Sequence, residues 1–69
     1  MLFSDVSHKR AVRAFKKAGF WISHGTKHTG MTNGTEKIII PRHSRINPYT
    51  LKIIINAAGL TDAEFKKLL

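Results

Sequence analysis

The chain has 69 residues, which suffice for one domain over residues 1–69 but leave little interior to enclose a large substrate. Twelve lysines and arginines stand against four aspartates and glutamates, and the net charge of +8 favours a polyanionic partner such as nucleic acid. Cysteine is absent, which excludes disulfides, thiolate nucleophiles and sulfur-ligated zinc, and no apolar run could span a membrane, so we expect a cytoplasmic protein with no membrane partner.

A basic helix is predicted over residues 4–18. Ser4 is a suitable N-cap, apolar residues recur at helical spacing, and Gly19 ends the pattern. The spacing i, i+4, i+7 and i+8 puts four basic side chains on the opposite face, namely Lys9, Arg13, Lys16 and Lys17. We call these four residues the cationic strip and predict that they bind RNA phosphates.

Three strands are predicted next. Residues 20–22 begin a β-prone run that ends in a turn near residues 25–26, and residues 27–32 form a second strand. Asn33 followed by Gly34 predicts a two-residue hairpin turn into a third strand over residues 35–40, which pairs antiparallel with the second. Trp21 could stack on a base, but a lone tryptophan in an apolar strand is more often part of the core, and we expect that here.

Two further helices complete the chain. Asn47 and Pro48 begin a helix that runs to Gly59, and Thr61 with Glu64 forms a capping box for a short last helix. The predicted order is α-β-β-β-α-α. The fold class is therefore α+β, with a three-stranded antiparallel sheet and the helices packed on one face.

The four histidines, at positions 8, 24, 28 and 43, are candidates for proton transfer near neutral pH. His24 and His28 have the spacing of a helical zinc pair, but a turn separates them, so we expect no metal and no cofactor. Cleavage of an RNA phosphodiester needs a proton acceptor and nearby cations. A group of histidines and basic residues in the middle of the chain could supply both, namely Lys27, His28, Arg42, His43 and Arg45. Each histidine alone is more often a solvated or packing residue, and composition alone favours a non-catalytic nucleic-acid-binding module.

Four segments in order resemble the HicA toxin family of toxin-antitoxin modules: FKKAGF at 15–20, GTKH at 25–28, IPRH at 40–43, and PYTL at 48–51 running to AGL at 58–60. The resemblance covers about residues 6–60. It implies a fold like that of double-stranded-RNA-binding domains and a metal-independent endoribonuclease that cleaves mRNA. It also implies a HicB-like antitoxin, encoded beside the toxin, as the protein partner.

The resemblance also implies a catalytic histidine. In the family this residue follows a glycine at the start of the second strand, and here it corresponds to Lys27 or to His28. Only His28 keeps the chemistry, so we predict His28 as the general acid or base, with Lys27 and Arg42 in supporting roles. His43 is either structural or a phosphate ligand. The alternatives are a non-catalytic RNA-binding module and a subunit that only binds protein.

Overall fold

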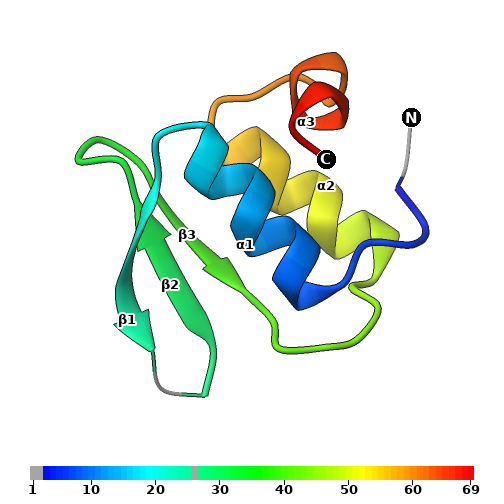
Figure 1. Cartoon of the computed structure of the whole chain (residues 1–69), viewed down its shortest axis with the longest axis horizontal. Coiled ribbons are helices and arrows are strands. Elements are labelled where there is room, and N and C mark those ends of the chain that lie inside the picture. Colours follow the sequence, from blue (N-terminus) through cyan, green and yellow to red (C-terminus); the bar gives the residue numbers. More distant parts are fainter. Residues whose placement is uncertain (1–2, 26) are drawn as a thin grey trace.

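The computed structural model describes residues 3–25 and 27–69. Its elements follow the predicted order, with α1 over His8–Lys17, β1 over Trp21–Gly25, β2 over Thr29–Thr32, β3 over Lys37–Ile40, α2 over Pro48–Ala57 and α3 over Asp62–Leu68 (Figure 1). The predicted α+β class is therefore confirmed. The turn expected at residues 25–26 falls partly on Thr26, which lies outside the described residues.

Helix α1 begins later than the sequence indicated, so the expected start at Ser4 is wrong. Ser7 is the N-cap, and its hydroxyl accepts a hydrogen bond from the backbone N–H of Arg10 at 3.2 Å. The preceding residue, Val6, is buried, and its carbonyl accepts from the N–H of Ile46 at 2.8 Å. This pairing holds the entering segment against the loop that follows β3, so residues 4–7 cannot join the helix.

The three strands form one antiparallel sheet in the order β1-β2-β3. Strand β2 begins at Thr29, two residues later than predicted, and β3 begins at Lys37 instead of residue 35. Thr32 pairs with Lys37, which leaves residues 33–36 as a four-residue loop. The predicted two-residue turn is therefore wrong. The Asn33 side chain closes the loop by accepting hydrogen bonds from the N–H groups of Thr35 and Glu36, and Gly34 has the positive φ of 93° that this turn requires.

Both later helices begin as predicted. Asn47 caps α2 by accepting from the N–H groups of Tyr49 and Thr50, and the Thr61–Glu64 capping box at α3 is complete. An ion pair of 2.6 Å between Lys52 Nζ and Asp62 Oδ2 joins α2 to α3.

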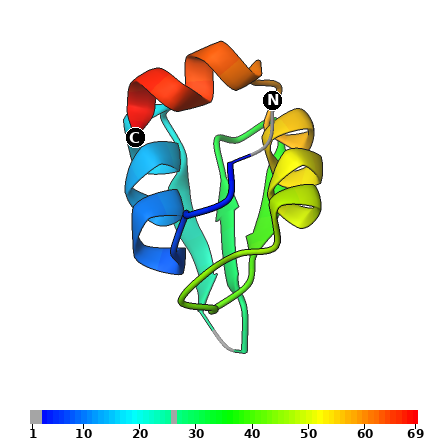
Figure 2. The ribbon, with the colours of Figure 1, turned by 90° about the vertical axis from the view of Figure 1, so that its right-hand side faces the viewer.

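The helices cover one face of the sheet and leave the other open. Figure 2 shows α1 and α2 side by side against the sheet, with α3 lying across their ends. The core between these layers is continuous, and its largest fully buried side chains are Phe15, Phe65, Met31, Ile40, Ile46, Leu51, Ile55 and Val6. Among residues 3–25 and 27–69, no helix is long and apolar enough to cross a membrane.

Candidate functional site

The register of the strands decides which side chains lie on the uncovered face of the sheet. Side chains directly opposite in an antiparallel sheet point to the same face, so one row across the open face is His24, Gly30 and Ile39. A second row is Trp21, Thr32 and Lys37, in which Trp21 and Lys37 are exposed and Thr32 is buried. The alternate rows contain Met31, Ile38, Thr29 and Ile40, which are buried against the helices.

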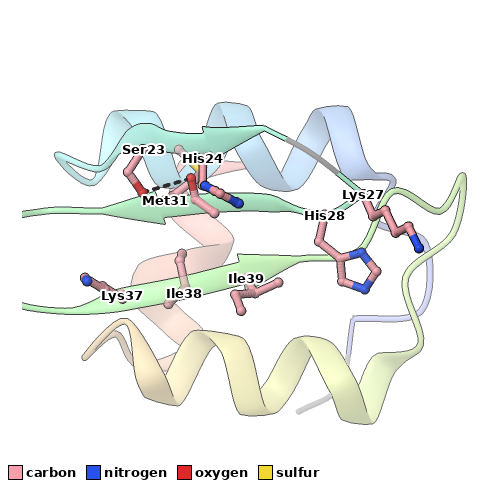
Figure 3. A pocket seen from close by; sticks show the side chains of 9 residues that line it. Ser23, His24, Lys27, His28, Met31, Lys37, Ile38 and Ile39 are labelled. Atoms are coloured by element: carbon pink, nitrogen blue, oxygen red, sulfur yellow. Dashed lines mark hydrogen bonds between the residues drawn. The ribbon is translucent and has the colours of Figure 1, made fainter.

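A hollow of about 590 Å³ lies at this sheet, and we call it the sheet hollow. Its lining residues are Ser23, His24, Lys27, His28, Gly30, Met31, Lys37, Ile38 and Ile39. Figure 3 shows His28 and Lys27 at one end of the hollow, Lys37 at the other, and Ile39 between them. The described lining therefore combines apolar surface with two lysines and two histidines.

His28 and Lys27, the predicted catalytic residue and its neighbour, are both exposed at this hollow. They precede β2 and do not belong to it, because the strand begins at Thr29. His28 thus lies on the turn that joins β1 to β2, where a bound strand could reach its imidazole without entering the core.

Arg42 is held next to this turn by a specific contact. Its Nη2 donates a hydrogen bond of 2.9 Å to the carbonyl of Gly25, the last residue of β1. Arg42 also lines a second hollow, between the start of α1 with Lys9 and the loop after β3 with His43. The guanidinium therefore lies between the turn that carries His28 and the start of α1.

Three residues of the cationic strip line a third hollow, which shares lining residues with the second. Lys9, Arg13 and Lys16 lie along it with Val12, and His8 and Lys9 belong to both hollows. We call the two together the helix groove. Lys17 is exposed on α1 but is not part of this lining.

Arg45 differs from the other predicted cations. It is exposed, its Nε lies 3.7 Å from Asp5 Oδ1, and it does not line the sheet hollow or the helix groove. Such an exposed pair contributes little to stability, but the carboxylate offsets the charge that Arg45 could offer to a phosphate. Its contact with RNA stays a prediction.

A known protein family matches most of the chain. The family model described as the HicA toxin of bacterial toxin-antitoxin systems matches residues 9–60 of the 69. The chain belongs to the HicA toxin family. It is therefore the toxin of a toxin-antitoxin pair, and its partner is an antitoxin. Searches of curated proteins and of solved structures returned no match.

Every site residue predicted from the sequence lies within the part of the chain that matches the HicA family. His8 and α3 lie outside it, although both contact the matched region. The assignment of His8 and α3 to the same fold is therefore based on their contacts with the matched region and not on the family match.

His8 is a residue whose role the sequence analysis missed. It is partly buried, its Nε2 lies 2.7 Å from Thr29 Oγ1, and its backbone N–H donates to the carbonyl of His43 at 3.0 Å. It therefore ties the start of α1 both to the start of β2, next to His28, and to the loop that follows β3. No sequence signal could have identified this contact, because its two side chains are 21 residues apart.

The surroundings of His8 predict that acid destabilises this HicA fold. Partial burial lowers the pKa of His8 below its ordinary value of 6.5, and the charges of Arg42 and Lys9 lower it further. The unfolded chain then binds more protons than the folded chain just below pH 6.5, so the free energy of unfolding should fall as the pH drops through that value. We expect the urea midpoint to drop between about pH 7.5 and 5.5, and to drop less in His8→Gln. Equal drops in both proteins would contradict this role of His8.

Trp21 is not part of the core, so that expectation was wrong. Its side chain is 53% exposed on the open face of the sheet. Helices α1 and α2 lie on the other side of the sheet. A Cβ atom added at Gly34 would lie 3.6 Å from Trp21 Cη2, so the ring lies beside the β2–β3 loop. An edge strand with one uncovered face leaves this ring in solvent.

Proposed function

We propose that the protein is a metal-independent endoribonuclease that cleaves mRNA, with His28 as its general acid or base. The observation that carries this proposal is the position of His28. It lies exposed beside Lys27 at the sheet hollow, and Arg42 is hydrogen-bonded to the adjacent end of β1. An imidazole and cations in one accessible place are the groups that cleavage of an RNA phosphodiester needs.

The proposed reaction uses the ribose of the substrate as its nucleophile. His28 accepts the proton of a 2′-hydroxyl, and the 2′-oxygen forms a bond to the adjacent phosphorus while the bond from phosphorus to the 5′-oxygen breaks. The leaving 5′-oxygen takes up a proton from water, and the products are a 2′,3′-cyclic phosphate and a free 5′-hydroxyl. Lys27 and Arg42 offset the negative charge that develops on the phosphate oxygens.

The helix groove is the proposed path for the rest of the RNA backbone. Its walls carry Lys9, Arg13 and Lys16 from α1 together with Arg42 and His43 from the loop after β3. Lysine and arginine bind phosphates without reading sequence, so this surface supplies affinity and holds the strand in place near His28.

Changing the cationic strip should therefore reduce the salt dependence of RNA binding. Replacing Lys9, Arg13, Lys16 and Lys17 with glutamine should flatten the slope of log affinity against log salt by about 2.8, because each single-strand phosphate contact contributes about 0.7. Filter binding or fluorescence anisotropy at several salt concentrations measures this slope.

A matched control separates local contacts from the effect of net charge. The variant R13Q/K16Q should flatten the slope by about 1.4, whereas K66Q/K67Q removes two exposed charges from α3 and should leave the slope nearly unchanged. Equal slopes for these two variants would contradict the placement of RNA along α1.

The antitoxin is proposed to be HicB-like and to inhibit by covering the turn that carries His28. The surface around this turn is basic, because Lys27 and Arg42 are exposed there. A complementary antitoxin would present an acidic surface to it.

One incubation tests the proposed function against its alternatives. Purified protein is mixed with end-labelled single-stranded RNA in excess chelator, and the RNA is analysed on denaturing and native gels. Cleavage supports the ribonuclease. Retention without cleavage would show an RNA-binding module instead. If the RNA is neither cleaved nor retained, the protein is a subunit that binds only protein.

A further inference from the structure

The open face of the sheet exposes apolar side chains that a domain of this size would be expected to bury. Trp21 is 53% exposed and Ile39 is 61% exposed, although the helices fully bury Met31 and Ile40 on the other face. Both residues lie on rows of the sheet that face away from the helices. This face is therefore available to an occupant that is not part of the described chain.

The arrangement of this face connects Trp21 to the proposed catalytic turn. Trp21 lies at the end of the sheet near the β2–β3 loop, and His28 lies on the turn at the opposite end. The row of Ile39 is two residues further along the strands than the row of Trp21, a step of about 7 Å, and it lines the sheet hollow (Figure 3). Trp21 thus lies one such step from the row that lines the sheet hollow, and His28 lines the far end of that hollow.

The charges on this face select the class of occupant. The described lining of the sheet hollow includes Lys27 and Lys37 and no carboxylate, and the whole chain carries a net charge of +8. An aromatic ring among cations matches a nucleic acid, whose bases stack on the ring while its phosphates meet the lysines. A base can stack on Trp21 only when it is unpaired, because a duplex keeps the faces of its bases covered by their neighbours.

We propose that the open face binds single-stranded RNA, with one unpaired base stacked on Trp21 and the adjoining nucleotides crossing the sheet hollow toward His28. This inference rests on the proposed function and names the form of its substrate. It makes Trp21 a binding residue that selects single strands over duplexes, a role separate from that of the cationic strip.

The first test uses the emission of Trp21, which is the only tryptophan of the chain. A 2′-O-methyl oligouridine serves as a probe because it lacks the 2′-hydroxyl and cannot be cut by the proposed reaction. Saturating amounts should quench the emission of the wild-type protein, whereas a fully paired 2′-O-methyl duplex of the same length should quench it much less. No quenching at saturation, with binding established by anisotropy of a labelled strand, would overturn the proposal.

The second test uses a matched pair of aromatic variants. Trp21→Ala should weaken binding of the labelled single strand about 5- to 150-fold, the loss expected for one base–aromatic stack, and Trp21→Phe should restore most of it. Tyr49→Ala removes an aromatic ring that is 70% exposed on α2, in the helix layer, and should leave the affinity unchanged. Equal losses for Trp21→Ala and Tyr49→Ala would overturn the proposal.

The outcomes also separate this inference from the proposed function. Quenching by the single strand in a protein that does not cleave RNA would support base binding while contradicting the ribonuclease. Cleavage at a normal rate and equal affinity in Trp21→Ala would contradict base binding alone. Quenching by an antitoxin but not by the oligonucleotide would identify the face as a protein-binding surface and overturn the proposal.

Discussion

Replacing His28 with alanine is expected to lower the rate of RNA cleavage by a factor of about 10² to 10⁴ or more, the contribution of one general acid or base. The side chain is exposed and lies on a turn, so its removal leaves no cavity in the core. The variant should keep the circular dichroism spectrum of the wild type and most of its affinity for an uncleavable RNA strand. Single-turnover cleavage of labelled RNA measures the effect.

The same assay on His43→Ala tells which histidine performs the chemistry. His43 lines the helix groove, and its backbone carbonyl is tied to the N–H of His8. A normal cleavage rate in His28→Ala combined with a large loss in His43→Ala would move the proposed proton transfer to His43.

Replacing Phe65 with alanine is expected to unfold much of the protein population. Phe65 lies on α3, is fully buried, and packs against Phe3 and Phe15 with ring centroids 5.2 Å apart in both pairs. A phenylalanine-to-alanine change in a core costs about 3–5 kcal/mol, and a domain of this length has only about 3–10 kcal/mol of total stability. Urea unfolding followed by circular dichroism measures the loss.

The control for this prediction is Ile53→Ala on α2. Ile53 is 68% exposed, so its truncation should change the free energy of unfolding by no more than about 0.5 kcal/mol. A comparable small effect of Phe65→Ala would contradict the packing described here. It would mean that residues 62–68, which lie beyond the family match, are dispensable to the core.

The fold could be predicted from local signals where these act without competition. Asn47 with Pro48, and Thr61 with Glu64, each place a cap and the first turn of a helix within four residues, and the structure has both. The predicted start of α1 at Ser4 was wrong, because Ser4 and Ser7 are both suitable N-cap residues and the helix uses Ser7. The pairing of Val6 with Ile46, 40 residues further along the chain, decides between them and leaves no local trace.

The candidate site could likewise be predicted only where the signals are local in sequence. The spacing of the cationic strip put Lys9, Arg13 and Lys16 on one face, and these residues do share a hollow. The hydrogen bond from Arg42 to Gly25 and the contact between His8 and Thr29 depend on how the chain folds back on itself. The exposure of Trp21 depends on which face of the sheet the helices cover, which the alternation of apolar residues in so short a strand does not determine.

We propose that this HicA-family toxin cuts RNA by attack of the RNA's own 2′-hydroxyl, with a histidine as general acid or base. The most direct test compares two labelled strands of one sequence in excess chelator, one all ribose and one with 2′-deoxyribose on the 5′ side of the cleaved bond. We predict that the ribose strand is cut to a 2′,3′-cyclic phosphate and a 5′-hydroxyl, while the substituted strand stays intact at that bond and binds with similar affinity. Cutting of both strands at that bond at the same rate would contradict the account.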